Sequence, residues 1–377
     1  MIKILIAGDY CPHNRVYSLI EDEKYDVIFD EVKQYTQEAN FSIINLEAPV
    51  VSSNSIKPIK KCGPNLKCSI KAIKALKFAG FDMVTLANNH FYDYGEKGVK
   101  ETLEICIQED LSVVGGGNNI TEAARIFYKK IEGVIFAFIN CCEHEFSIAT
   151  NKTGGSNPLD SIRQYYAIQE AKKNADKVIL IVHGGHEFYQ LPSPRMKKLY
   201  HFFIDIGADV VINHHQHCYS GYEIYNEKLI FYGLGNFCFD WDRRRNSIWN
   251  VGYMVSLNFN DKNLFFELVP YRQGDKKLGV SMIKDDVDKR SFVESVNALN
   301  LIIADNLKLE AEHQSFMEKT KSSYLITFEP YRNRYLKALY VRHLLPSFMN
   351  EKKRLRLLNY LQCESHFERV IDAITNK

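Results

Sequence analysis

Short runs of apolar, mostly β-branched residues recur along the first two thirds of the chain, and polar loops or helical spacings separate them. Residues 178–182 and 209–212 are two such runs, and their length and branching predict buried strands. Between them, apolar residues at spacings of three and four predict a helix over 194–206, which Gly207 ends. A strand, a helix and a second strand in this order make the two strands parallel. The two strands therefore end at the same edge of a sheet.

The same alternation predicts further strands on both sides of that unit. Residues 221–225 and 229–232 form a predicted hairpin. After Gly274 the apolar spacing becomes helical and stays so through the rest of the sequence. We therefore predict an α/β fold with two domains, residues 1–275 and a helical extension over residues 276–377. The other predicted strands cover residues 2–7, 41–44, 82–86, 111–114, 133–139, 251–259 and 264–270.

Composition narrows the class of protein. The chain has 377 residues, and 48 Lys and Arg against 46 Asp and Glu leave a formal net charge of +2. That balance argues against a surface that binds nucleic acid over the whole molecule. The sequence starts directly with a predicted strand, and no apolar run approaches the roughly 18 residues of a membrane span. Nine cysteines, an odd number, fit reduced thiols better than a disulfide framework, so we expect a cytoplasmic protein.

Residue types that bind metals follow the predicted strands where each strand ends. Taken singly, each has an ordinary alternative, since an aspartate such as Asp9 is also a common turn former or N-cap. Together they offer imidazole, carboxylate and amide ligands at one edge of the sheet, as a site for one or two divalent transition metals requires. The candidate ligands are Asp9, Glu47, Asn89, His183, His215 and His217.

The segment after the strand at 82–86 carries a second kind of chemistry. His90 follows Asn89 directly, and Asp93 lies three residues further on. An imidazole with a carboxylate to orient it is suited to proton transfer. The four lysines between 57 and 67 are interpreted as a solvated loop, with an approach path to the site as the alternative. Residues 143–145 are likewise interpreted as a solvent-exposed charged loop rather than as part of a second site.

Six short motifs follow one another in a fixed order. They are Gly8-Asp9, Asn45-Leu46-Glu47, Asn88-Asn89-His90 with Asp93 and Gly95, His183-Gly184-Gly185-His186-Glu187, the run from Gly207 to Asn213-His214-His215-Gln216-His217, and Tyr232-Gly233-Leu234-Gly235-Asn236-Phe237. In this order they resemble the capsule synthesis protein CapA family, also called the poly-γ-glutamate capsule family. The resemblance covers about residues 1–245.

That family is similar to the calcineurin-like metallophosphoesterases, so the resemblance implies a four-layer α/β/β/α sandwich with a two-metal centre of Mn, Fe or Zn. His90 would be the general acid and Asp93 would orient it. The motif neighbours Arg15, His186, Glu187, His214 and Asn236 would contact substrate. Carried over by motif, Asp9 and His217 would hold one metal, Asn89, His183 and His215 would hold the other, and Glu47 would bridge them.

Two positions depart from the phosphoesterase pattern. The first phosphoesterase motif is Asp-x-His, whereas position 11 here is Cys. The bridging carboxylate is Glu47 within Asn-Leu-Glu, where the phosphoesterases have Asp. One metal position is therefore short of a ligand unless His13 or Cys11 substitutes, and the resemblance leaves open whether one ion or two are bound.

The resemblance implies a role in the biosynthesis of a capsule or another surface polymer, polysaccharide or poly-γ-glutamate. One hypothesis is a divalent-metal-dependent hydrolase of phosphoester or amide bonds. The alternative is a non-catalytic assembly or polymer-binding component of a membrane-bound synthase. A third hypothesis, a nucleic-acid phosphodiesterase, is supported only by the basic segment 331–356. No specific nucleic acid is therefore expected as a partner.

The basic tail adds one expectation about partners. Residues 331–356 hold eight Lys or Arg against one acidic residue, interleaved with aromatic side chains. A solvated helical face explains such a segment, and so does contact with anionic lipid head groups or phosphate backbones. The expected partners are the surface polymer or its precursor, a membrane-bound synthase and, through residues 331–356, the inner face of the membrane.

Overall fold

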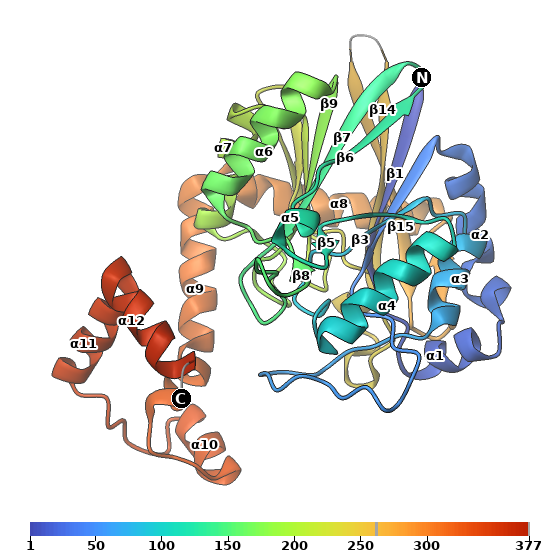
Figure 1. Cartoon of the computed structure of the whole chain (residues 1–377). Helices are drawn as coiled ribbons and strands as arrows, with labels where there is room; N and C mark the ends of the chain where they lie inside the picture. Colours follow the sequence, from blue (N-terminus) through green and yellow to red (C-terminus); the bar gives the residue numbers. More distant parts are fainter. Residues whose placement is uncertain (261–262, 376–377) are drawn as a thin grey trace. The chain divides into compact units, whose positions relative to one another are not determined.

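The computed structural model describes residues 1–260 and 263–375, and two stacked mixed β-sheets form its centre (Figure 1). The eight-stranded sheet has the order β16-β15-β14-β1-β2-β3-β4, and β13 pairs with β1 beside this path. Strands β1 to β4 are parallel to one another, whereas β14 to β16 are antiparallel. Its strands are β1 (Ile2–Tyr10), β2 (Phe41–Leu46), β3 (Met83–Thr85), β4 (Ser112–Val114), β13 (Asn236–Cys238), β14 (Val251–Phe259), β15 (Leu264–Gln273) and β16 (Val280–Met282).

The six-stranded sheet has the order β11-β12-β10-β9-β7-β6. Its inner strands β7, β9, β10 and β12 are parallel, and the predicted hairpin forms the β11–β12 edge. A separate pair joins β5 (Gly116–Gly117) to β8 (Gly155–Ser156). The strands of the six-stranded sheet are β6 (Phe127–Ile131), β7 (Val134–Cys142), β9 (Lys177–His183), β10 (Val210–His214), β11 (Tyr222–Tyr225) and β12 (Lys228–Phe231).

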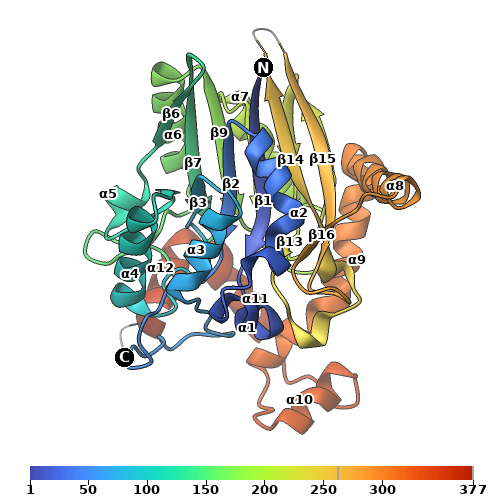
Figure 2. The same ribbon diagram turned by 90° about the vertical axis from the view of Figure 1, so that its right-hand side faces the viewer.

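Alternation along the strands produces three apolar layers. In β1, Ile4 and Ile6 pack between the two sheets, whereas Leu5 and Ala7 pack against the helices of the outer face. Helices α1 to α4 cover the eight-stranded sheet, and α6 and α7 cover the six-stranded one (Figures 1 and 2). This confirms the predicted four-layer α/β/β/α sandwich. The helices are α1 (Asn14–Glu21), α2 (Tyr25–Glu38), α3 (Ile70–Phe78), α4 (Gly95–Gln108), α5 (Ile120–Ala123), α6 (Ser161–Asn174), α7 (Pro194–Asp205) and α8 (Asp286–Ala304).

The sandwich continues beyond residue 275, where the sequence pattern placed the domain boundary. Strand β16 pairs with β15, and Phe292 and Val296 of α8 are buried in the layer between the sheets. The first compact unit is therefore Met1–Leu309, and the second is Glu310–Lys377. The sequence pattern does not indicate this continuation of the sandwich, because β16 has only three residues and an amphipathic helix follows it.

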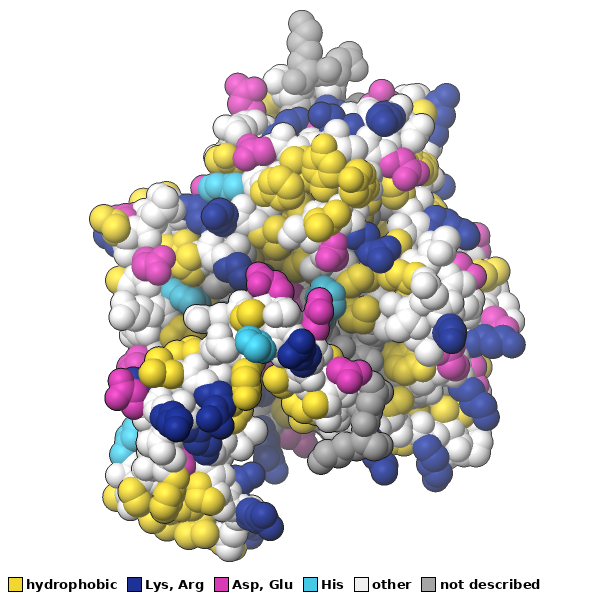
Figure 3. All heavy atoms as spheres, turned by 60° about the vertical axis from the view of Figure 1, so that its left-hand side comes forward, with side chains coloured by type: hydrophobic (Ala, Val, Ile, Leu, Met, Phe, Trp, Pro, Cys, Tyr) yellow, Lys and Arg dark blue, Asp and Glu magenta, His cyan; other side chains and the backbone are white. Residues whose placement is uncertain are grey.

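The second unit is helical. Among its described residues, Tyr340 and Glu329 are the buried side chains, while many large apolar side chains are exposed. On the face of the molecule that Figure 3 shows, hydrophobic side chains lie next to Lys or Arg side chains. No helix in residues 1–260 and 263–375 is both long and apolar enough to span a bilayer. The remaining helices are α9 (Asn306–Leu325), α10 (Arg334–Val341), α11 (Glu351–Gln362) and α12 (Glu364–Thr375).

Candidate metal centre

The candidate ligands meet where the parallel strands of both sheets end. Asp9 near the end of β1 is paired in register with Asn45 of β2, and His183 of β9 is paired with His214 of β10. Gly8 lets β1 pass close to the backbone of Gly235, because a Cβ at position 8 would lie 1.9 Å from the Gly235 oxygen. The parallel topology thus brings together residues more than 200 positions apart in sequence.

Glu47 lies at the centre of the cluster. Both of its carboxylate oxygens are buried, and neither has a hydrogen-bond partner in the part of the chain that the structure describes. Burial, followed by the negative charge of Asp9, raises the pKa of Glu47 well above its usual value. A buried carboxylate without a donor is costly unless a cation balances it, so this residue fits a metal ligand.

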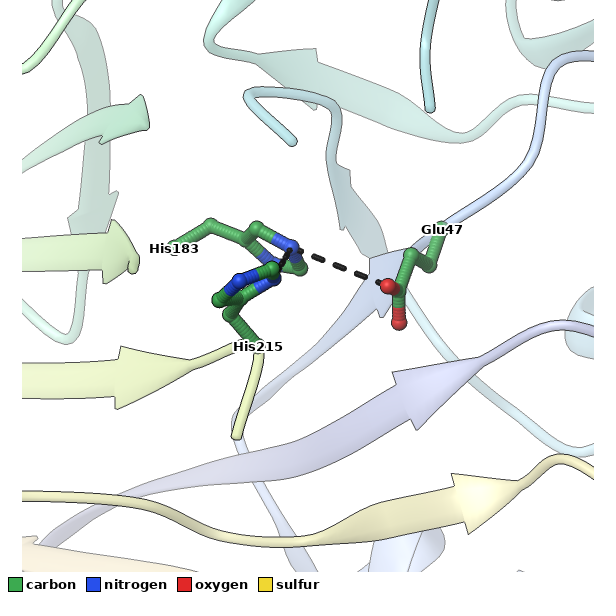
Figure 4. A group of neighbouring side chains, drawn as sticks. All are labelled: Glu47, His183 and His215. Atoms are coloured by element: carbon green, nitrogen blue, oxygen red, sulfur yellow. Dashed lines mark hydrogen bonds and ion pairs between the residues drawn. The ribbon is translucent and has the colours of Figure 1, made fainter. Parts of the chain in front are cut away.

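One group of possible ligands consists of Glu47, His183 and His215, whose ligand atoms lie within 4.8 Å of one another. His183 Nε2 is 3.7 Å from Glu47 Oε1 and 3.1 Å from His215 Nδ1, and the three side chains point toward one another in Figure 4. Asn89 Oδ1 lies 3.1 Å from the same His183 nitrogen, so it can add an amide oxygen.

The two imidazoles of this group are suited to be neutral ligands. Burial, then the charge of His215, lowers the pKa of His183 well below its usual value. Burial, then the charge of His217, lowers the pKa of His215 to about 4. Both rings are thus neutral near pH 7, and a neutral imidazole is the form that binds metals.

A second group consists of Asp9, Glu47 and His217, and it shares Glu47 with the first. His217 Nε2 is 3.5 Å from Glu47 Oε1, and its Nδ1 is 3.7 Å from Asp9 Oδ2. Asn236 Oδ1 accepts a hydrogen bond from His217 Nδ1 at 2.9 Å, which leaves Nε2 free to face Glu47. Because a shared carboxylate can bridge two cations, the donor set fits one or two divalent ions.

The backbone between β10 and the second group is strained. His215 has φ 92° and His217 has φ 54°, in the left-handed region that side chains with a Cβ avoid. Such conformations cost of order 1–3 kcal/mol each and persist where the surroundings enforce them, frequently at functional sites. Here the two strained residues, His215 and His217, are candidate ligands of the two neighbouring groups.

Asp9 is held ionised by its neighbours. Burial alone would raise its pKa, but the hydrogen bond and charge of His214, with the charges of His183 and His217, hold it below its usual value. Asn45 Nδ2 donates to Asp9 Oδ1 at 2.7 Å and lies 3.2 Å from His183 Nδ1, so Asn45 connects ligands of the two groups. The sequence pattern gave no role to Asn45.

The predicted acid–base pair lies beside the ligands. His90 Nδ1 and Asp93 Oδ2 are 2.7 Å apart, and Asp93 is fully buried. Lys61 forms an ion pair with Asp93 and places Nζ 3.1 Å from His90 Nδ1. Burial is the main cause that lowers the pKa of His90, against the opposing effect of Asp93.

A cavity of about 260 Å³, which we call the site cavity, opens beside these residues. Asn89, His90 and His217 line it on the side of the ligands. Much of the rest of its wall is aromatic, and its charged lining residues include acids as well as bases. The aromatic and charged lining residues are Phe188, Phe239, Trp241, Trp249, Lys61, Glu145, Glu187 and Arg244.

Of the five predicted substrate contacts, Glu187 lines the site cavity. His186 and Arg15 do not line it, and Arg15 instead makes a bidentate ion pair with Asp240 at 2.8–2.9 Å. His214 is buried 3.4 Å from Asp9 Oδ1, and Asn236 is buried against His217. Neither of them lines the site cavity, and each lies beside a candidate ligand.

The proposed substitutes for the missing ligand do not join the groups. Cys11 is buried in the core between the eight-stranded sheet and its helices. His13 stacks on Trp241 with ring centroids 5.0 Å apart. Each group nevertheless offers three protein ligands, the number at which catalytic metal sites keep a position open for water.

Sequence reasoning missed contributions from residues of two charged loops. Lys61 was interpreted as a solvated lysine, but only 2% of its side chain is exposed because Asp93 holds it. Glu143 is not free, since it accepts a hydrogen bond from Gly185 N at 3.0 Å and pairs with Arg195. Glu145 lines the site cavity. None of these roles has a local sequence signal, because each partner is distant in the chain.

Comparison with known proteins agrees with the motifs. The capsule biosynthesis protein CapA of Bacillus anthracis is 31% identical over 335 residues, covering 85% of this chain and 80% of that protein. The PGA biosynthesis protein CapA of Bacillus subtilis is 35% identical over 276 residues, covering 72% and 71%. A crystal structure of a novel phosphatase from Mycoplasma pneumoniae aligns with 73% of this chain and 95% of that chain, at 14% identity and a TM-score of 0.46, which is too low to support an argument.

The family model described as bacterial capsule synthesis protein PGA_cap matches residues 3–241, and all the candidate ligands lie within that range. The match spans more than half of the chain, and the family expected from the motifs is confirmed. The chain therefore belongs to the bacterial capsule synthesis protein family PGA_cap.

Proposed function

We propose that this protein is a divalent-metal-dependent hydrolase that cleaves phosphoester or amide bonds during the synthesis or processing of a capsule polymer, polysaccharide or poly-γ-glutamate. The observation that carries the proposal is the meeting of two ligand groups at Glu47, directly beside the His90–Asp93 pair and a cavity that can admit substrate. The names of the two Bacillus relatives support the link to capsule biosynthesis.

The ligand groups assign residues to each metal position. Asp9, Glu47 and His217 would hold one ion, and Glu47, Asn89, His183 and His215 would hold the other. A bound Mn, Fe or Zn ion lowers the pKa of a water ligand and stabilises the negative charge that develops on the substrate. The metal itself is not identified by the donor set, since all three ions accept imidazole and carboxylate ligands.

His90 is the residue suited to protonate the leaving group. It lines the site cavity, and its Nδ1 faces Asp93, so Nε2 is the ring nitrogen available to substrate. Asp93 in turn accepts a hydrogen bond from Leu66 N at 2.6 Å and pairs with Lys61, which fixes the carboxylate. A general acid of this kind contributes about 10²–10⁴-fold to a rate.

The test combines metal content with hydrolysis. Protein purified without chelator should contain at least one equivalent of Mn, Fe or Zn, and it should cleave members of a panel of phosphoester and γ-glutamyl substrates. His90→Ala should lower the rate by about 10²–10⁴-fold while keeping the metal. His144→Ala, an exposed histidine of the loop after β7, is the matched control and should leave the rate unchanged. Less than a stoichiometric equivalent of metal would count heavily against the proposal.

A second candidate function is a non-catalytic component that binds the polymer or assembles with a membrane-bound synthase. The observation in its favour is that Cys11 stands where the phosphoesterase motif has a histidine ligand, and it is buried in the core. This function predicts polymer binding without turnover, whether or not metal is present. Equal, background-level hydrolysis by the wild type and His90→Ala, together with polymer binding, would favour it.

The proposed partners include an anionic membrane surface. Residues 331–356 combine eight Lys or Arg with exposed apolar side chains such as Leu344 and Phe348. Basic and apolar side chains together suit the head-group region of an anionic bilayer. A protein held there would lie near a membrane-bound synthase, at the inner face of the membrane.

A further inference from the structure

Residues 241–250 form a wall between two cavities of the first unit. Trp241, Arg244 and Trp249 line the site cavity on one side. Asn246, Ile248 and Asn250 line a second cavity of about 710 Å³, which we call the basic cavity. A ligand that is long enough can therefore occupy both cavities by crossing this segment.

On the side of the site cavity, Arg244 offers a charge that no acid neutralises. Its guanidinium lies 3.9 Å from the centre of the Phe188 ring, and it has no ion pair within residues 1–260 and 263–375. The neighbouring Arg245, by contrast, pairs with Asp240 and Asp242. Arg244 is thus available to an anionic group of a ligand.

The aromatic residues that line the site cavity favour a ligand with an apolar surface. Phe188, Phe239, Trp241 and Trp249 stand next to Arg244 around the site cavity, with Phe239 and Trp249 at a ring-centroid distance of 5.0 Å. Such faces pack against methylene groups or rings rather than against bare anions. A ligand unit that combines an anionic group with an apolar stem fits this side of the cavity.

The basic cavity continues the positive charge beyond the wall. Arg272, Lys276 and Lys277 line it, against one acid, Asp275. Lys277 is paired with Glu31 at 2.6 Å, but Arg272 and Lys276 form no ion pair with any described residue. Two cations remain for a ligand at this cavity.

The acids of the site cavity restrict where an anion can lie. Glu145 and Glu187 line the same cavity as Arg244. These carboxylates disfavour an anion in their part of the cavity. Free cationic groups therefore occur at Arg244 and then in the basic cavity, which gives the bound ligand a direction.

We propose that an extended polyanion whose units carry apolar stems crosses residues 241–250, with one unit against Arg244 and the aromatic wall and the following units on Arg272 and Lys276. The inference rests on the proposed function in that it treats the site cavity as the place where the polymer is bound for cleavage. What it adds is the path of the polymer across residues 241–250 and its direction away from the candidate metal centre.

Binding can be measured without hydrolysis, because the only two tryptophans of the chain, Trp241 and Trp249, both line the site cavity. Their fluorescence is titrated with γ-linked oligoglutamates of two or three units and of ten or more units, and with polyphosphate of matched length. The long oligoglutamate should bind more tightly than the short one. Polyphosphate lacks an apolar stem and should change the fluorescence least.

Two variants test the contribution of each cavity to binding separately. Arg272→Ala/Lys276→Ala should weaken the long oligomer about tenfold and leave the short one unchanged, a size expected for two exposed charge contacts. Arg244→Ala should weaken both lengths. The controls are Arg243→Ala, the exposed neighbour that lines neither cavity, and Lys74→Ala/Lys97→Ala on α3 and α4. Circular dichroism melting checks that every variant is folded.

Results that differ from these would contradict particular parts of the proposal. No binding of oligoglutamate by the wild type, or equal effects of the double variant on both lengths, overturns the path across residues 241–250. Equal affinities of Arg244→Ala and Arg243→Ala overturn the role of the site cavity. Length-dependent binding without hydrolysis would instead keep this inference and remove the proposed catalysis, so the two failures are distinguishable.

Discussion

The two units of the chain use their side chains in opposite ways. The unit Met1–Leu309 buries three apolar layers and also buries its polar chemistry, including Asp9, Glu47 and His183. In the unit Glu310–Lys377 the apolar side chains are mostly exposed, and Tyr340 is the buried one among the described residues. Side chains such as Leu344, with 66% of its surface exposed, gain little stability from packing inside that unit.

The difference separates two kinds of task. A closed core holds ligands rigidly, which a metal centre and an acid–base pair both require. Exposing apolar side chains to water costs free energy. Contact with an anionic partner that covers the apolar and basic surface removes that cost. We therefore propose that the first unit carries the chemistry and that the second unit attaches the protein to a partner.

The largest expected effect tests the difference in packing. Phe138 is fully buried between the sheets, with its ring centroid 5.5 Å from that of Phe41. Phe138→Ala should lower the free energy of unfolding by about 3–5 kcal/mol, because it removes apolar contacts and leaves a cavity. Phe348→Ala, at a side chain 58% exposed in the second unit, should change it by less than about 0.5 kcal/mol. Urea denaturation measures both, and comparable losses would contradict the comparison.

The next effect concerns the buried carboxylate Glu47 of the candidate metal centre. Glu47→Gln should raise the melting temperature of the metal-free protein, since it removes a buried carboxylate that lacks a donor, worth about 1–3 kcal/mol. The same variant should lose the stabilisation by added Mn or Zn, which is about 2.7 kcal/mol for wild type at 100 times Kd. Glu187→Gln, which lines the site cavity outside both ligand groups, should keep it. A metal-induced rise that survives in Glu47→Gln would exclude this residue as a ligand.

The positions of the candidate ligands could be predicted because two local signals agree. A short apolar run gives a strand, and parallel strands end at one edge, so a polar residue just after a run is placed without knowledge of distant contacts. Glu47 and His183 were found in this way, and the structure brings them together. The α/β class followed from the same alternation of strands and helices, whereas the four-layer arrangement was implied by the family resemblance.

The remaining parts depend on contacts that no local pattern encodes. Arg15 lies close to Asp9 in sequence, but its guanidinium binds Asp240, 225 residues away. Lys61 belongs to a polar loop, and its burial results from the turn that carries Asp93. Helix α1 was missed because Val16 and Ile20 are its only buried residues, too few for a periodic signal.

A smaller effect is expected at the exposed surface of the second unit. Leu344→Glu/Phe348→Glu should weaken binding to vesicles that contain anionic lipid by at least about tenfold, because carboxylates replace apolar side chains next to basic ones. Leu307→Glu is the control, since Leu307 is 84% exposed but belongs to the first unit. Sedimentation with anionic and with neutral vesicles measures the binding. Equal binding of the double variant and the wild type would contradict membrane contact through this surface.

The smallest effect compares a buried ion pair of the first unit with an exposed pair of the second. Asp240 accepts bidentate hydrogen bonds from Arg15 and Arg245 at 2.8–2.9 Å. Burial alone would raise its pKa, but these arginines outweigh burial and lower it to about 2. Because the folded-state pKa is below the unfolded one, the ionised carboxylate stabilises the fold above about pH 4, and this contribution is lost as the pH falls toward 2.

Asp240→Asn removes that titration. The difference in unfolding free energy between wild type and Asp240→Asn should therefore shrink by about 1 kcal/mol between pH 5 and pH 2, a value reduced because both arginines are partly exposed. In the second unit, the Glu318–Lys321 pair at 3.1 Å is exposed on both sides, so Glu318→Gln should stay within about 0.5 kcal/mol of wild type at every pH. Urea denaturation over this pH range measures both differences. A constant difference for Asp240→Asn would mean that Asp240 does not change its pKa on folding, and the contrast between the two ion pairs would then rest on packing alone.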